Sequence, residues 1–212
     1  MKKNVITISR EFGSGGRTIG RLTAERLGYA FYDGELVKKV AEATGFDEKY
    51  IEQEGEYAPV KSWFAYAFSA RGMDAASGGM SNDDYLWATQ YKVIREIAEK
   101  GNCVIVGRCA DFILKDLENC LNVYIHADMQ ARADRIVKRY GEKPDSPQKR
   151  LTEKDKKRKL HYKRYTGQDW GVSQNYHLCL DSSALGIGRC VEMILQAHED
   201  RLDEIDWESG TE

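Results

Sequence analysis

Short apolar runs rich in β-branched and aromatic residues recur along the chain. Five of them predict buried strands, at residues 5–8, 30–32, 103–106, 122–125 and 178–180. Segments with the period of a helix lie between most of these runs, and strands that alternate with helices form a mainly parallel sheet covered on both faces. The pattern therefore predicts a three-layer α/β/α domain with a five-stranded, mainly parallel sheet.

Apolar residues three or four positions apart predict the helices. Ile19, Leu22 and Leu27 form one such stripe, and that helix is expected to stop at Gly28. Further helices are predicted around residues 36–41, 86–98, 129–140 and 187–195. Together these helices supply the two outer layers of the domain.

Two stretches break this alternation and are expected to leave the core. The first, about 45–82, is aromatic, which favours packing or a contact in a homodimer over a base-stacking platform; its aromatic residues include Trp63, Phe64, Tyr66 and Phe68. The second, 141–171, contains a very polar helix with Leu151 and Leu160 as its only aliphatic residues. A helix with so little to bury is expected to be a mobile flap or a solvated surface.

Composition and charge narrow the class of protein. The 212 residues, 42% of them apolar, can bury one sizeable core, and a net charge of -2 argues against a wholly basic nucleic-acid coat. Residues 132–164 nevertheless hold 14 Lys and Arg against five Asp and Glu. On the helix in this stretch, Arg132, Arg135 and Arg139 are expected to lie on the outer face. Something anionic is expected to bind this segment.

The apolar runs, the N-terminus and the cysteines of the chain indicate its compartment and the state of its thiols. No apolar run approaches the roughly 18 residues that a membrane span needs, and the N-terminus passes into a strand without a secretory signal, so we expect a cytoplasmic protein with no membrane partner. The five cysteines are an odd number without a C-x-x-C pair, and Cys103 and Cys179 lie in strand-like runs. We expect reduced core thiols rather than zinc ligands or disulfides.

The strongest local signal is a strand, a glycine-rich turn and a helix over residues 5–18. Such a turn aims several backbone N–H groups at one point, where the helix dipole adds positive potential. Against the P-loop pattern G-x-x-x-x-G-K-[ST], Arg10 replaces the first Gly and Gly16 replaces the Lys. The alternative is a tight turn without a ligand. The predicted phosphate cradle consists of Gly13, Ser14, Gly15, Gly16, Arg17 and Thr18.

Further candidate groups follow the second and third predicted strands. Asp33 and the pair Gly107-Arg108 stand at carboxyl ends of strands, where parallel sheets place ligand groups. Arg108 could reach a phosphate or carboxylate with its planar fork. In the cradle, Arg10 or Arg17 could replace the missing Lys. Each group alone could equally be a cap or a surface ion pair, but together they favour a binding site.

The order of these pieces resembles the cytidylate kinase-like family of nucleoside monophosphate kinases over most of the chain. The matching pieces are the loop at 13–18, Tyr32-Asp33-Gly34, residues 104–108, Glu153-Lys154-Asp155 and Asp181-Ser182-Ser183. The resemblance implies one domain, 1–212, with an inserted acceptor lobe at 34–100 and a basic lid at 141–171. It also implies ATP on the first loop and an acceptor, such as CMP or dCMP, at Arg108.

The resemblance implies roles for single residues as well. Asp33 would lie near the acceptor hydroxyls or Mg²⁺, and Lys157, Arg158 and Arg164 would close over ATP as lid residues. In the loop itself, Thr18 could hold Mg²⁺ through its hydroxyl. The implied catalytic set is Arg17, Asp33, Arg108 and Arg158. ATP and Mg²⁺ are the cofactors that this reading requires.

The chain also departs from the family pattern. Val106 and Cys109 replace acids that flank the Gly-Arg turn in family members, so Asp111 or Asp33 would have to compensate at the metal. These departures and the missing loop Lys leave open a non-catalytic nucleotide sensor. Nucleic-acid binding through 132–164 is the third hypothesis, and we expect it less than the other two.

Overall fold

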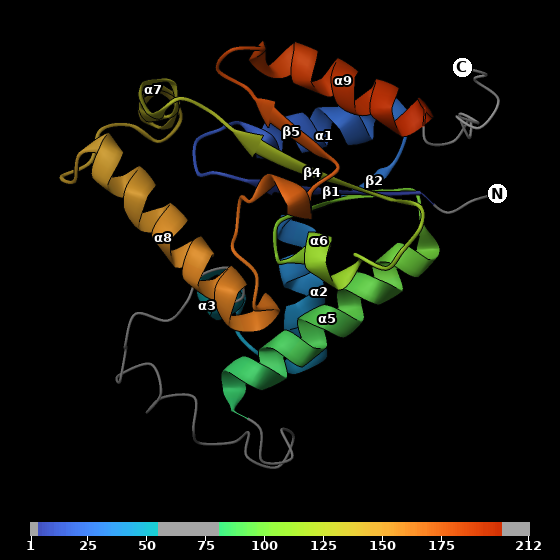
Figure 1. The fold of residues 1–212 in the computed structure, drawn as a ribbon. Helices are drawn as coiled ribbons and strands as arrows, with labels where there is room; N and C mark the ends of the chain where they lie inside the picture. Colours follow the sequence, from blue (N-terminus) through green and yellow to red (C-terminus); the bar gives the residue numbers. More distant parts are fainter. Residues whose placement is uncertain (1–3, 55–80, 201–212) are drawn as a thin grey trace, which may run out of the picture.

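The fold is an alternation of strands and helices around one sheet, seen in a computed structural model that describes residues 4–54 and 81–200 (Figure 1). The elements are β1 Val5–Arg10, α1 Gly16–Leu27, β2 Ala30–Tyr32, α2 Gly34–Thr44, α3 Glu48–Glu54, α5 Asn82–Lys100, β3 Cys103–Val106, α6 Ala110–Ile113, β4 Cys120–His126, α7 Met129–Tyr140, α8 Pro147–Thr166, the short 3-10 helix Ser173–Asn175, β5 Leu178–Asp181 and α9 Gly186–Asp200. The predicted aromatic contact at residues 63–68 lies outside the described residues.

The five strands form one sheet in the order β2-β3-β1-β4-β5. All four neighbouring pairs are parallel, and Val5 of β1 lies beside Cys103 of β3 and Cys120 of β4. The five predicted strands and the parallel sheet are therefore confirmed. Since β1 is the central strand, the loop that follows it opens between the ends of two neighbours.

Alternate residues of the strands face two separate cores. Ile6 and Ile8 of β1 pack with helices α1 and α9, whereas Val5 packs with α2, α3, α5 and α6. This alternation is the period of a strand, and it gives the central strand β1 packed apolar side chains on both faces of the sheet. Figure 1 shows the resulting layers, with α1 and α9 on one side of the sheet and α2, α5 and α6 on the other.

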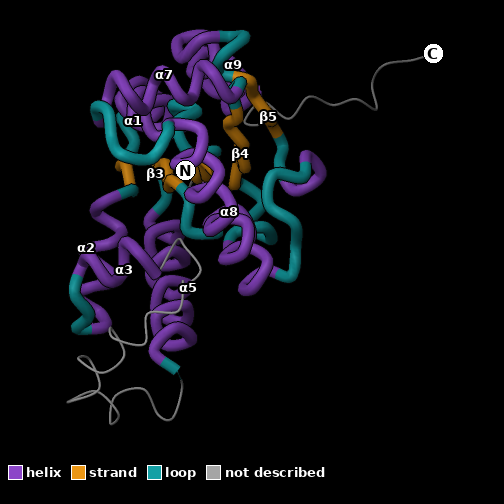
Figure 2. Tube along the Cα trace, turned by 90° about the vertical axis from the view of Figure 1, so that its left-hand side faces the viewer, coloured by secondary structure: helices purple, strands orange, loops and turns teal. Residues whose placement is uncertain are grey.

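Helices α7 and α8 lie beyond the carboxyl ends of the strands, at the left of Figure 1 and in front of the strands in Figure 2. Ser146 caps α8 by accepting a hydrogen bond from Lys149 N at 3.2 Å. The expectation that α8 has little to bury is wrong. The helix does bury one face, and that face is mostly polar. That face consists of Leu151, Asp155, Arg158, His161 and Tyr162. A search for apolar periodicity could not detect such a face.

One cysteine prediction also needs correction. The five cysteines are free thiols and four are buried, but Cys179 is exposed. β5 is an edge strand of the sheet, and Cys179 is the exposed position in it. No helix within residues 4–54 and 81–200 has the length and hydropathy to cross a membrane.

Candidate active site

The glycine-rich loop joins the central strand to the first helix. The side chain of Ser14 is buried and donates to the carbonyl oxygen of Glu11 at 2.9 Å, and Ser182 donates from beyond β5 to the carbonyl oxygen of Ser14. A Cβ atom on Gly16 would stand 2.5 Å from the Cβ of Arg10, so the loop tolerates only glycine there. The turn is therefore tightly held, and it leads into the first backbone N–H groups of α1, which have no acceptor within the helix. This is the geometry of an anion site.

Three arginines of α7 reach this loop from one face of the helix. Arg132 Nε donates to the carbonyl oxygen of Phe12 at 2.8 Å, and Arg135 Nη1 donates to that of Gly13 at 2.6 Å. Arg139 Nη1 lies 3.4 Å from Thr18 Oγ1. Arg132 is buried, so the prediction that it lies on an outer face is wrong: the loop covers it. Burial lowers the pKa of Arg135, in keeping with a guanidinium partly removed from water.

Two carboxylates neutralise the charge of the buried Arg132 guanidinium. Arg132 pairs with Glu11, Nη1 to Oε2 at 3.0 Å, and through Nη2 with Asp155 of α8. Asp155 Oδ1 also accepts from Phe12 N at 2.8 Å, while Arg158 Nη1 donates to the carbonyl oxygen of Arg10 at 3.1 Å. The loop, α7 and α8 are therefore joined by one network of charges.

The predicted residues Arg17 and Asp33 meet in an ion pair, with the Arg17 side chain 57% exposed and that of Asp33 16% exposed. Within the described part of the chain, no three His, Cys, Asp or Glu side chains gather closely enough to hold a metal. Mg²⁺ in phosphate-transfer sites usually takes one or two protein oxygens and completes its shell with phosphates and water. Thr18 and Asp33 carry oxygen atoms of the kind that such a partial ligand set uses.

The turn after β3 has an unusual backbone. Gly107, Arg108 and Cys109 have φ angles of 74°, 61° and 54°, which is the left-handed region in three successive residues. Arg108 Nη1 donates to the carbonyl oxygen of Ile51 at 2.8 Å and lies 3.4 Å from Gln90 Oε1. Gln90 Nε2 in turn donates to the carbonyl oxygen of Arg108 at 3.2 Å. The arginine is thus fixed between α3 and α5.

Asp111 lies behind this turn, in the core. Its carboxylate accepts from Ser9 Oγ at 3.1 Å and from the Tyr162 hydroxyl at 2.7 Å. Burial raises the pKa of Asp111, and the two hydrogen bonds oppose that rise. Both carboxylate oxygens face protein donors, so Asp111 serves as a strut between β1, α6 and α8, and the structure does not turn it toward Thr18.

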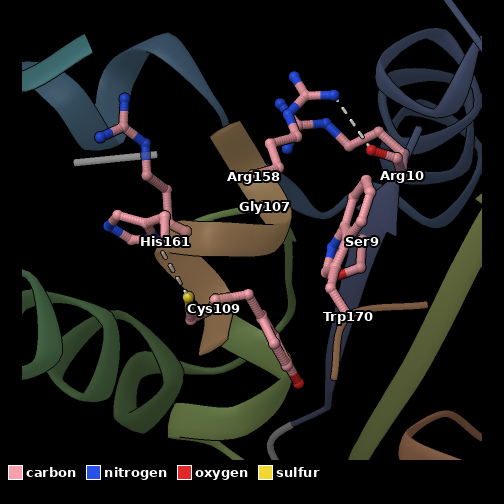
Figure 3. A pocket seen from close by; sticks show the side chains of 9 residues that line it. Ser9, Arg10, Gly107, Cys109, Arg158, His161 and Trp170 are labelled. Atoms are coloured by element: carbon pink, nitrogen blue, oxygen red, sulfur yellow. Dashed lines mark hydrogen bonds between the residues drawn. The ribbon is translucent and has the colours of Figure 1, made fainter. Parts of the chain in front are cut away.

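A pocket opens where these elements meet (Figure 3). Its lining residues are Ser9, Arg10, Gly107, Arg108, Cys109, Arg158, His161, Tyr162 and Trp170. Three predicted residues, Arg10, Arg108 and Arg158, therefore come together from β1, the turn after β3 and α8. A pocket lined by three guanidinium-bearing residues suits a compact anion.

Other predicted residues lie away from this pocket. Arg164 pairs with Asp83 of α5 at 3.3 Å, and beside it Tyr165 stacks on Trp87 with ring centroids 4.6 Å apart. Lys157 lies on the same helix but is not part of the pocket lining. The C-terminal half of α8 thus rests on α5, whereas its N-terminal half rests on the phosphate loop.

Sequence reasoning missed several residues of this site. The spacing of Arg132, Arg135 and Arg139 puts them on one helix face, because residues three and four positions apart lie side by side. The apolar stripe of the same helix led to the prediction that this face is the outer one. Gln90 and His161 gave no signal, since a single polar residue in a helix is ordinarily solvated.

Comparison with known proteins agrees with the fold. The model of the cytidylate kinase-like family matches residues 5–184. The cytidylate kinase of Methanopyrus kandleri is 28% identical over 188 residues, 84% of each chain. An uncharacterized protein from Eubacterium ventriosum has a TM-score of 0.69 at 25% identity, covering 93% of this chain and 99% of its own.

A more distant structure has the same fold. The shikimate kinase of Acinetobacter baumannii has a TM-score of 0.55 at 18% identity, covering 97% of both chains. This similarity is one of fold alone. The family match spans the loop, the turn after β3 and α8, and on that ground the chain belongs to the cytidylate kinase-like family.

Proposed function

We propose that this protein transfers the γ-phosphoryl group of ATP to a nucleoside monophosphate or a similar small acceptor. The observation that carries the proposal is the single pocket that Arg10, Arg108 and Arg158 line together, at the ends of β1 and β3 and beside α8. Phosphoryl transfer asks little covalent work of a protein. It needs two anions placed in line and neutralisation of the charge on the transferring oxygens.

The roles follow from position. The loop at 13–18, with Arg17, would hold the ATP phosphates, and Arg108 would hold the acceptor phosphate. Arg135 now donates to the carbonyl oxygen of Gly13 in the loop, and Arg158 donates to that of Arg10 just before it; a phosphate oxygen is a stronger acceptor for the same donors. Bound ATP would therefore compete for these donors without any large movement of α7.

The metal would be bound at the mouth of the loop. Thr18 and Asp33 would contribute oxygens to Mg²⁺, which when bound offsets charge on the ATP phosphates. Arg17 now pairs with Asp33, so this carboxylate would leave its ion pair when the metal binds. We assign residues 34–100 to the acceptor lobe and 141–171 to the lid, with Lys157 and Arg164 as its outer cations.

The decisive experiment measures ADP formation from ATP and Mg²⁺ with CMP, dCMP, UMP, AMP and small non-nucleotide alcohols as acceptors. The double variant Arg17→Ala, Arg108→Ala serves as the blank. Turnover with one acceptor, lost in the variant, would support the proposal and name the substrate. If the pure protein binds ATP but forms no ADP with any acceptor, the kinase proposal is abandoned.

One observation favours a second function, that of a nucleotide sensor without catalysis. Gly16 stands at the position of the loop Lys, and Asp33 is engaged by Arg17 rather than facing an open metal site. A sensor would show nucleotide-dependent protection of α8 in hydrogen exchange with no ADP formed. This outcome would replace the kinase proposal while leaving the phosphate loop in place.

A further inference from the structure

A thiol forms part of the pocket wall. Cys109 follows Arg108 directly and lies with its Sγ 3.7 Å from Nδ1 of His161, a contact drawn in Figure 3. The two residues come from separate elements, the turn before α6 and the middle of α8, and both line the pocket. Cys109 is 5% exposed, so the pocket is its route to solvent.

The thiol shares its pocket with three arginine residues. Arg10, Arg108 and Arg158 line the same pocket as Cys109 and His161. The thiolate is the reactive form of cysteine, and neighbouring cations stabilise it relative to the thiol. An imidazole nitrogen at hydrogen-bond distance can accept the thiol proton, as in other nucleophile and base pairs.

The backbone at Cys109 has a conformation that is unfavourable for residues other than glycine. A residue other than glycine in the left-handed region costs free energy, of order 1–3 kcal/mol, and persists only where its surroundings hold it. Arg108 and Cys109 both adopt it, and Gln90 holds the carbonyl oxygen of Arg108. The turn therefore presents the thiol to the pocket rather than to the core.

The remaining cysteines provide a contrast within the same chain. Cys103, Cys120 and Cys190 are buried among the core residues, and burial raises the pKa of Cys103 to about 12. Cys179 is exposed, and desolvation raises its pKa as well. None of these four lines the pocket.

We propose that Cys109, with His161 as its proton acceptor, is a modification site for small disulfide-type electrophiles. The Cys109 thiolate attacks one sulfur of the reagent, a new S–S bond forms, and the original bond breaks. The departing sulfur leaves with the electron pair and takes the proton held by His161, so Cys109 is oxidised and the reagent reduced. The proposal stands on the pocket alone and does not depend on kinase activity.

The test uses methyl methanethiosulfonate, which transfers a CH₃S group to a thiolate and releases methanesulfinate. The native protein is treated for increasing times, quenched and digested, and the label on each cysteine is measured by mass spectrometry. We expect Cys109 to react at least about tenfold faster than Cys103, Cys120 and Cys190, the factor that corresponds to one pKa unit of thiolate population. Equal rates at Cys109 and Cys103 would overturn the proposal.

Two further arms test the surroundings of the thiol. Saturating inorganic phosphate should slow labelling at Cys109 and leave Cys179 unchanged, because only Cys109 shares the cationic pocket. His161→Asn should slow Cys109 about tenfold, with Cys179 as the internal standard. An unchanged rate in a folded His161→Asn protein would remove His161 from the proposal.

Because His161 packs near Tyr165, with ring centroids 4.8 Å apart, circular dichroism must first show that the variant is folded. If it is not, the phosphate arm decides on the wild-type chain. Labelling of Cys109 that phosphate does not slow would then mean that the thiol is reached by another route, which contradicts the proposal.

Discussion

The two sides of the pocket hold their arginines differently. On the phosphate-loop side, Arg132 and Arg135 donate to carbonyl oxygens of the loop, and Arg158 donates to that of Arg10 at the end of β1. On the opposite side, Arg108 donates away from the loop, to Ile51 and Gln90 in the acceptor lobe. The first arrangement stabilises a loop, and its donors can be shared with an anion. The second ties the position of one guanidinium to the packing of two helices.

The largest effect should come from breaking the loop side at Arg132. In Arg132→Met the carboxylates of Glu11 and Asp155 lose their shared partner, and Asp155 remains buried. Removing one partner of a buried ion pair costs about 3–5 kcal/mol. We expect a loss of that size in the free energy of unfolding, measured with urea.

The matched control is Arg21→Met, which removes an exposed arginine that pairs with Glu25 one helical turn away. Exposed pairs of this kind contribute about 0–1 kcal/mol. If both variants lose the same small amount, the loop network is no more than a surface contact, and the contrast between the two sides disappears.

A smaller effect should follow from breaking the Arg108 side at Gln90. Gln90 is almost fully buried, and Gln90→Leu leaves the carbonyl oxygen of Arg108 without its donor. An unsatisfied buried polar group costs about 1–3 kcal/mol. If Arg108 holds the acceptor, the variant should also raise KM for the acceptor more than KM for ATP.

The control for this variant is Gln90→Glu, which keeps an oxygen facing the guanidinium of Arg108 and removes only the amide donor. It should retain more acceptor affinity than Gln90→Leu. Equal rises of both KM values in Gln90→Leu would argue that the residue supports the fold in general and does not position Arg108.

The smallest expected effect is on the pH dependence of stability. It concerns Asp111, which accepts hydrogen bonds from Ser9 of β1 and Tyr162 of α8. Burial raises its pKa above the ordinary value of 3.8, so the folded chain holds this proton more tightly than the unfolded chain does. Stability from the protonated carboxyl is then fully present below the unfolded pKa and is lost as pH rises through the folded pKa. The stability of the wild type relative to Asp111→Asn should fall by at most about 1.4 kcal/mol per pH unit in that window.

The measurement is urea unfolding of both proteins at a series of pH values from about 4 upward. Asp111→Asn does not titrate at this position and supplies the baseline. A relative stability that rises with pH would mean that the donors Ser9 and Tyr162 outweigh burial, and that the carboxylate is charged in the folded protein.

The fold was predictable because its signals are local. The strands are short apolar runs in the sequence, and helix ends such as Gly28 and Gly45 carry their own stop signal. The site was predictable where it follows a strand, as at Asp33 and Arg108. These features need no knowledge of which distant residue they touch.

The remaining part of the site depends on contacts between distant segments. Asp155 meets Phe12 across 143 positions, and Arg108 meets Ile51 across 57. Nothing in the local sequence of α8 distinguishes the buried Arg158 from the lysines beside it, because basic residues recur along the whole helix. Such polar burial becomes visible only when the chain is folded.

The pocket also contains an indole. Trp170 is part of the pocket lining and meets Tyr124 edge-on, with ring centroids 5.5 Å apart. Indole emission shifts in wavelength and intensity when charge or water near the ring changes. Occupancy of the pocket can therefore be followed by the protein's intrinsic fluorescence, with no dye attached, and Trp170→Phe provides the spectrum to subtract.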